Sequence, residues 1–280
     1  MAPSRRQSAV VKRAPATSRR GSTRAAERVK RWPGPERAVD AECEFIYGFH
    51  AAEEALRNPY RSIRRLLVTE NALRRLAALP AGVSPQIVTP RDIARLLPAD
   101  AVHQGVLVEA APLPWPTLDE LAGKRVLIAL DQITDPHNVG AILRTAAAFA
   151  VAAAIVPIRH SPAMSGVLAK AASGAVEHVP LVAVRNLAEA LIDLGERGYL
   201  RVGLDSQAAS ALEYAPLRDP LVLVLGAEGK GLRERVRQCC DLVARIDLPG
   251  AIRSLNVSNA AAIALSVVNR RLAPPRADRR

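Results

Sequence analysis

Three stretches of the chain place glycine and polar side chains directly after a run of apolar residues. They are residues 131–144 (DQITDPHNVGAILR), residues 225–232 (LGAEGKGL) and residues 245–259 (RIDLPGAIRSLNVSN). A bend between the carboxyl end of a strand and the amino end of a helix leaves backbone N–H groups free, and α/β proteins hold ligands at such bends. The three stretches therefore predict a binding site at one edge of a sheet.

The first stretch offers an amide, Asn138, and a guanidinium, Arg144. Asn138 is well placed to cap the helix that should begin there. Arg144 follows among apolar residues, where its charge needs a partner. The fork of the guanidinium suits a phosphate, and a structural ion pair is the alternative. We interpret His137 as a turn residue rather than a base.

The second stretch is rich in glycine, but its spacing excludes two familiar phosphate loops. A Walker-type loop needs Ser or Thr after Gly-Lys, whereas Gly231 follows Lys230 here. The three-glycine dinucleotide pattern is also absent. What remains is a bend with a single carboxylate, Glu228, that suits a ligand lying flat on bare backbone. The alternative is a tight turn with a surface glutamate.

In the third stretch, Pro249 and Gly250 end an apolar run because they cannot continue a strand ladder. The polar residues that follow either cap the next helix or face a ligand. Because the strands of a parallel sheet end at one edge, we expect the polar side chains of all three stretches to converge on one pocket. They are Asn138, Arg144, Glu228, Ser254 and Asn256.

The elements that must position these residues alternate between strands and helices, which predicts an α/β fold with a mainly parallel sheet covered on both faces. The predicted strands are residues 126–131, 153–157, 179–182, 200–204, 221–225 and 242–248. The predicted helices are residues 139–149, 166–172, 187–197, 232–239 and 257–272.

A smaller α/β unit precedes this sheet, and the proline-rich residues 110–116 (AAPLPWP) separate the two as a stiff connector. Its predicted strands are residues 63–68, 86–88 and 105–109, and its predicted helices are residues 50–57, 71–79 and 90–97. Six arginines crowd its first half, where they either face RNA or form an ordinary solvated surface. They are Arg57, Arg61, Arg64, Arg65, Arg74 and Arg75.

The net charge of +12 lies at the two ends of the chain. Residues 1–40 hold 11 Lys/Arg against 3 Asp/Glu, and residues 270–280 hold 5 against 1, so the 229 residues between them sum to zero. Residues 1–40 lack apolar periodicity, and we expect them to be disordered. A basic arm adds salt-sensitive attraction to phosphates. The alternatives are a solvated tail without a partner and a cleaved transit peptide.

Composition excludes several classes of protein. No apolar run approaches the roughly 18 residues that span a bilayer, and no apolar segment of a secretory signal is present, so we expect a soluble protein. The cysteines are Cys43, Cys239 and Cys240. An odd count with two adjacent members is a poor disulfide framework, and no metal-ligand spacing is present. These features favour a reducing, cytoplasmic location and no metal.

Taken together, the three stretches resemble the SpoU/TrmH class of RNA ribose 2′-O-methyltransferases. The similarity runs from about residue 124 to residue 272, through residues 138–140 with Arg144, residues 225–231, and residues 246–249 with 254–259. The amino-terminal unit is similar to the L30e-like substrate-binding domain of this class, with residues 47–48 and 103–106 as landmarks. Within the class, the chain most resembles enzymes that methylate a guanosine ribose in 23S rRNA.

Composition and the resemblance together predict an order of domains, and the resemblance implies a set of partners. A disordered basic arm (1–42) would precede an L30e-like RNA-binding domain (43–111), a proline-rich linker (112–123), a SPOUT-type methyltransferase domain (124–273) and a basic tail (274–280). The carboxyl-terminal sheet would contain a trefoil knot, although knots are rare. The protein would be a homodimer that acts on RNA, and S-adenosylmethionine would be its cofactor. Backbone groups of Gly226, Ile246 and Leu255 would hold that cofactor.

The resemblance also implies that Asn138, Arg144, Glu228, Ser254 and Asn256 surround the reacting groups. The sulfonium supplies an activated methyl group, so the protein must orient it and help the ribose hydroxyl lose its proton. Because arginine stays protonated at neutral pH, we expect Arg144 to stabilise developing negative charge while a phosphate or water shares in proton removal. Asn138 would fix Arg144.

Three other functions remain open at this point. One is the same chemistry on a tRNA or on another rRNA nucleotide. Another is a dimeric RNA-binding protein without catalysis. The third is a nucleotide-dependent oxidoreductase, which the missing glycine fingerprint disfavours.

Overall fold

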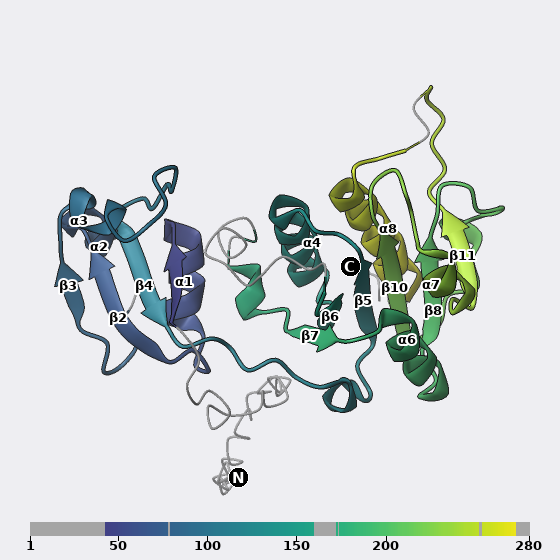
Figure 1. Ribbon diagram of the computed structural model, residues 1–280, viewed down its shortest axis with the longest axis horizontal. Coiled ribbons are helices and arrows are strands. Elements are labelled where there is room, and N and C mark those ends of the chain that lie inside the picture. Colours follow the sequence, from purple (N-terminus) through teal and green to yellow (C-terminus); the bar gives the residue numbers. More distant parts are fainter. Residues whose placement is uncertain (1–42, 78, 160–171, 173, 252–253, 273–280) are drawn as a thin grey trace, which may run out of the picture. The chain divides into compact units, whose positions relative to one another are not determined.

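The computed structural model describes residues 43–77, 79–159, 172, 174–251 and 254–272. Figure 1 shows two sheets in this part of the chain. The predicted basic arm, the basic tail and all but the last residue of the predicted helix 166–172 lie outside the described residues. No helix among those described is both long and apolar enough to cross a membrane.

The amino-terminal sheet has four strands in the order β1-β4-β2-β3. β4 runs antiparallel to β1 and β2, and β3 runs parallel to β2. Its strands are β1 (Glu44–Tyr47), β2 (Ile63–Val68), β3 (Pro85–Ile87) and β4 (Val106–Ala110). Its helices are α1 (Phe49–Arg57), α2 (Glu70–Arg75) and α3 (Pro90–Ala94). The predicted helix 71–79 is too long, because the chain becomes extended at Leu76 and turns Leu76 and Leu79 toward the core.

The carboxyl-terminal sheet has seven strands in the order β7-β6-β5-β10-β8-β11-β9, and every pair in it is parallel. The strands are β5 (Val126–Asp131), β6 (Ala153–Pro157), β7 (Leu181–Val184), β8 (Leu200–Leu204), β9 (Ser210–Ala211), β10 (Leu221–Gly226) and β11 (Leu242–Arg245). The helices are α4 (Pro136–Ala148), α6 (Leu187–Glu196), α7 (Glu234–Gln238) and α8 (Val257–Leu272). The predicted parallel sheet is confirmed.

β10 lies inside this sheet and contributes to the core on both faces. Leu221, Leu223 and Leu225 belong to one hydrophobic cluster, which includes residues of α4 and α8. Val222 and Val224, which point the other way, belong to a second cluster with residues of α6 and α7. Side chains of a strand alternate between its faces, so an uninterrupted apolar run is what a strand covered by helices on both sides requires.

β7 and β11 differ from their predicted bounds by two residues or more. β11 ends at Arg245 rather than at residue 248, because its neighbours β8 and the two-residue β9 offer no ladder partner further along. β9 is too short to show a periodic pattern and was not predicted. β7 lies at the opposite edge, two residues later than predicted.

Most arginines of the amino-terminal unit are exposed, but Arg61 is not. Arg61 is buried, and its guanidinium donates to Glu44, to the Ala111 carbonyl and to Glu177. Glu177 ends a one-turn 3₁₀ helix, Ala175–Glu177, and its carboxylate is also buried. Arg75 lies over the Phe49 ring at 4.3 Å from the centroid. Arg61 therefore has a structural partner, contrary to both predicted roles for this group.

Candidate active site

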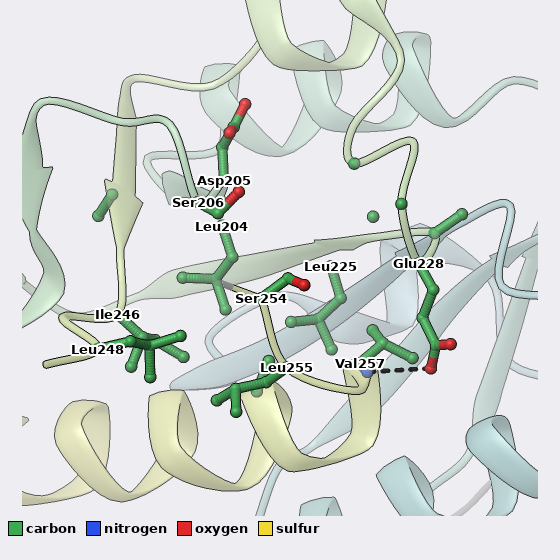
Figure 2. A pocket seen from close by; sticks show the side chains of 16 residues that line it. Leu204, Asp205, Ser206, Leu225, Glu228, Ile246, Leu248, Ser254, Leu255 and Val257 are labelled. Carbon is green, nitrogen blue, oxygen red and sulfur yellow. Dashed lines mark hydrogen bonds between the residues drawn. The ribbon is translucent and has the colours of Figure 1, made fainter. Parts of the chain in front are cut away.

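A pocket of about 270 Å³ lies at the carboxyl ends of β10, β8 and β11, which are neighbours in the sheet (Figure 2). The three predicted cofactor residues, Gly226, Ile246 and Leu255, all line it. Two of the predicted polar residues, Glu228 and Ser254, line it as well. The second and third stretches therefore meet at one cavity, as their position at one edge of a parallel sheet predicted.

The Gly-rich stretch forms a small closed loop beside this pocket. Gly231 N donates to the Ala227 carbonyl at 2.8 Å. A Cβ on Gly226 would lie 2.3 Å from the Gly231 carbonyl carbon, so only glycine lets the returning chain pass. Gly229 and Gly231 have φ of 73° and 66°, which L side chains rarely adopt. The loop thus presents bare backbone to the pocket.

Hydrogen bonds join one amide or carboxylate from each of the three stretches. Asn138 Nδ2 donates to Glu228 Oε1 at 3.1 Å, and Asn256 Nδ2 donates to Asn138 Oδ1 at 2.9 Å. Asn256 Nδ2 also reaches Glu228 Oε1 at 2.5 Å, and Val257 N donates to the same oxygen at 3.2 Å. Glu228 is exposed by area, yet three donor atoms contact its carboxylate. The stretch is thus a tight turn with an exposed glutamate, as the alternative has it, but the carboxylate is also tied to the other two stretches.

The predicted cap of α4, Asn138, is wrong, whereas the predicted cap of α8 is confirmed. α4 begins at Pro136, and its cap is Asp135, whose side chain accepts from His137 N at 3.0 Å. Proline favours the first helical position, so the helix starts three residues before the predicted 139 and leaves the Asn138 side chain free for the network. Asn256 Oδ1 does accept from Ser258 N at 2.9 Å, so Asn256 caps α8 and binds its partners at once.

Arg144 lies on α4 with an exposed side chain and does not line the pocket. Within the described residues it forms no hydrogen bond or ion pair, so the predicted structural ion pair is not found there. The prediction that Asn138 fixes Arg144 is wrong, because the Asn138 amide is bonded to Glu228 and Asn256 instead. As far as the described residues go, the guanidinium is therefore open to a ligand.

Sequence reasoning missed a further polar bend, Asp205-Ser206, which lines the same pocket directly after β8. Its signal was present, since a polar pair follows the apolar run 200–204 just as in the three stretches. Asp205 Oδ2 accepts from Arg237 Nη1 at 2.6 Å.

Among the described residues that line the pocket, the formal charges are negative. They belong to Asp205 and Glu228, and no lysine or arginine of the described part of the chain lines the pocket. Asp205 is neutralised by Arg237, whereas the structure pairs Glu228 with no cation in the part of the chain that it describes. No group of three or more His, Cys, Asp or Glu side chains that could hold a metal occurs among the described residues.

Comparisons with known proteins place this geometry in a family. Residues 125–266 match the SpoU rRNA Methylase family, and residues 45–116 match the family described as RNA 2′-O ribose methyltransferase substrate binding. The 23S rRNA (guanosine-2′-O-)-methyltransferase RlmB of Pseudomonas aeruginosa is 40% identical over 246 residues, which cover 84% of this chain and 99% of that protein. The RlmB of Shewanella oneidensis is 41% identical over 79% of this chain and 95% of its own.

Solved structures with the same fold include two SpoU/TrmH proteins. An RNA methyltransferase of the TrmH family from Porphyromonas gingivalis is 25% identical, with a TM-score of 0.69 over 82% of this chain and 90% of its own. AviRb from Streptomyces viridochromogenes, solved in complex with AdoMet, is 21% identical, with a TM-score of 0.70 over 82% and 90% of the two chains. The family matches and the extent of the identity together establish that this chain belongs to the SpoU rRNA methylase family.

Proposed function

We propose that this protein transfers a methyl group from S-adenosylmethionine to the ribose 2′-hydroxyl of a guanosine in 23S rRNA. The relatives named for this activity align with this chain over nearly their whole length. The observation that carries the proposal is the pocket at the ends of β8, β10 and β11, which adjoins the hydrogen-bonded trio Asn138, Glu228 and Asn256.

The pocket fits S-adenosylmethionine in shape and in charge. Apolar side chains of Leu225, Ile246, Leu248 and Leu255 line it together with the bare backbone of the Gly-rich loop, which suits a flat adenosyl group. The Glu228 carboxylate has no cationic partner among the described residues and favours a ligand with a positive charge. Gly226, Ile246 and Leu255 would hold the cofactor largely through backbone groups. When bound, the cofactor supplies the activated methyl group.

The remaining polar residues would handle the RNA. Arg144, exposed and without a partner among the described residues, would hold the phosphate and the reactive hydroxyl of the target nucleotide and stabilise developing negative charge. The network of Asn138, Glu228 and Asn256 would set the hydrogen bonds at the mouth of the pocket, and Ser254 would contribute a hydroxyl from the pocket wall. Proton removal would be shared with a phosphate or water.

The finer architecture is part of the same proposal. Residues 43–111 would form an L30e-like RNA-binding domain, residues 112–123 a linker and residues 124–273 a methyltransferase domain with a trefoil knot. The match of residues 45–116 to a substrate-binding family supports the first assignment. The protein would act in the cytoplasm as a homodimer with its sites near the subunit interface, and the basic arm (1–42) and tail (274–280) would attract RNA.

The test is methyl transfer from labelled S-adenosylmethionine by the purified protein, with 23S rRNA, 16S rRNA and total tRNA as competing substrates. The expected result is one 2′-O-methylguanosine in 23S rRNA, located by primer extension at low nucleotide concentration. Transfer to tRNA alone would reject the rRNA assignment, and the absence of transfer to any RNA would reject the enzyme. Loss of the same mark in cells that lack the protein would identify the natural site.

The basic arm is tested separately by deleting residues 1–40. These residues hold a net charge of +8 (11 − 3), so the truncated protein should bind RNA more weakly at low salt and show a smaller slope of log affinity against log salt. An unchanged slope would show that the arm does not contact RNA.

A further inference from the structure

Asp205 connects two of the strands that border the pocket, β8 and β11, to the helix α7, although its carboxylate does not face the cavity. Its backbone N donates to the Ala244 carbonyl at the end of β11 at 3.0 Å. Its Oδ1 accepts from Gln207 N at 2.8 Å, and its Oδ2 accepts from Arg237 Nη1 at 2.6 Å. Because Asp205 directly follows β8, its hydrogen bonds connect the ends of β8 and β11 to the helix α7.

Ion pairs connect α7 and the residue before it to the two strands on either side of β10. The Gly-rich loop begins at the end of β10. Arg233 N donates to Asp131 Oδ2 at 2.8 Å, and the Arg233 guanidinium donates to Asp131 Oδ1 at 2.7 Å. Asp131 is fully buried at the end of β5. β5 and β8 are the two neighbours of β10, so the pairs Arg233–Asp131 and Arg237–Asp205 anchor the end of the loop to both of them.

The direction of the Asp205 side chain shows that it acts through other groups. In Figure 2, Leu204 and Asp205 point in opposite directions, and the Asp205 carboxylate turns away from Ser254 and Leu255. Both carboxylate oxygens already accept hydrogen bonds from the chain. A ligand in the pocket would therefore touch the backbone near Asp205 rather than its charge.

We propose that Asp205, through its ion pair with Arg237, is a positioning residue that holds the Gly-rich loop at the distance from β8 and β11 that cofactor binding requires. The proposal rests on the proposed function, because it takes the pocket to be the site of S-adenosylmethionine. Preorganisation of this kind lowers the cost of ordering the loop when the ligand binds. Its loss should weaken cofactor binding more than it slows methyl transfer at saturating cofactor.

The chain offers a matched control at the opposite end of the same two strands. Asp241, just before β11, accepts from Arg201 N at 2.8 Å and from Arg201 Nη2 at 2.5 Å, and Arg201 lies in β8. This pair also joins β8 to the β11 segment through aspartate and arginine, but neither residue lines the pocket. A merely structural role for Asp205 would make the two aspartates equivalent.

The experiment compares Asp205→Asn, Arg237→Gln, Arg237→Lys and the control Asp241→Asn in the full chain. Calorimetric titration with S-adenosylmethionine gives Kd, steady-state methyl transfer gives kcat, and thermal unfolding reports stability. Asp205→Asn and Arg237→Gln should raise Kd about tenfold or more, the factor expected for a lost charge-assisted hydrogen bond. Arg237→Lys should restore most of the affinity because it keeps the charge.

The control and the kcat values decide between positioning and general loss of stability. Asp241→Asn should keep Kd within about twofold of wild type even where its unfolding temperature falls as far as that of Asp205→Asn. The kcat of Asp205→Asn at saturating cofactor should also stay within about twofold of the wild-type value. If Asp205→Asn and Arg237→Gln bind as tightly as Asp241→Asn, the inference is wrong while the proposed function stands. If wild-type protein binds no S-adenosylmethionine, both are wrong.

Discussion

Asn138 Nδ2 donates a hydrogen bond of 3.1 Å to Glu228 Oε1, although 90 positions separate the two residues in the sequence. The bond joins the first turn of α4 to the Gly-rich loop after β10. Asn256, the residue just before α8, donates to both side chains and completes the network. This network fixes a carboxylate at the pocket wall and leaves Arg144, farther along α4, without a partner among the described residues.

Replacing Arg144 with alanine should lower methyl transfer by at least about 100-fold, the usual scale for the loss of a key electrostatic donor. Because Arg144 does not line the pocket, the Kd for S-adenosylmethionine should not change. The measurements are transfer of labelled methyl to 23S rRNA and calorimetric titration with the cofactor. Arg235→Ala, on the exposed side of α7, is the control and should transfer at the wild-type rate. Near-normal turnover by Arg144→Ala would contradict the role proposed for Arg144.

Replacing Glu228 with glutamine removes its charge but keeps an oxygen that accepts hydrogen bonds from Asn138 and Asn256. A carboxylate on a partly solvated wall contributes on the order of 1 kcal/mol to binding a nearby cation, a factor of about five. The Kd for S-adenosylmethionine should therefore rise by about this factor, while that for the uncharged thioether S-adenosylhomocysteine should not. Equal effects on the two ligands would show that Glu228 acts without its charge.

Replacing Gly226 with alanine should abolish cofactor binding. The new Cβ would lie 2.3 Å from the Gly231 carbonyl carbon and 2.4 Å from its oxygen, so the loop would have to open. Gly250→Ala is a matched control in the next bend, because a Cβ at Gly250 meets nothing within 4 Å. Calorimetric titration of both variants should show binding only for Gly250→Ala. Wild-type affinity in Gly226→Ala would mean that the loop geometry does not matter.

Replacing Arg61 with alanine should lower the free energy of unfolding by about 3–5 kcal/mol, the range for removal of one partner from a buried ion pair. The Arg61 and Glu177 side chains are each 1% exposed, and the Glu177 carboxylate would lose its cationic partner and keep the hydrogen bond from Asn58 Nδ2. Arg57→Ala, which breaks exposed pairs with Glu53 and Glu54, should cost at most about 1 kcal/mol. Urea unfolding measures both, and similar losses would contradict the structural role of Arg61.

The Asp241–Arg201 pair should make a pH-dependent contribution to stability. The hydrogen bond from Arg201 holds the pKa of the Asp241 carboxyl below its usual value of 3.8. A lowered pKa in the folded state stabilises the protein above the pKa of the unfolded state, and the effect is lost as pH falls through the folded value. The difference in unfolding temperature between wild type and Asp241→Asn should therefore be largest near neutral pH and shrink below about pH 4. A constant difference across this range would exclude the linkage.

Local pattern was sufficient to predict most of the parallel sheet. β5, β6 and β8 have the predicted bounds, as does α8, because each is an apolar run or a segment with helical periodicity. The same reasoning identified Glu228 and Ser254, whereas the resemblance to the SpoU/TrmH class supplied Gly226, Ile246 and Leu255. All five line one pocket. It was less successful at the end of β11 and at the start of α4. The end of β11 depends on how far its neighbouring strands extend, and α4 begins earlier than predicted because Pro136 starts the helix.

By itself, the sequence determined the kind of fold, the three bends and the side chains that they carry, since these follow from short-range pattern. Only the tertiary structure decided their partners. Asn256 meets Glu228 across 28 positions and Asn138 across 118. The position of Asp205 beside the pocket depends on strand order, which places β8 between β10 and β11. Strand order results from packing the whole chain, so no local stretch encodes which carboxylate an arginine will meet.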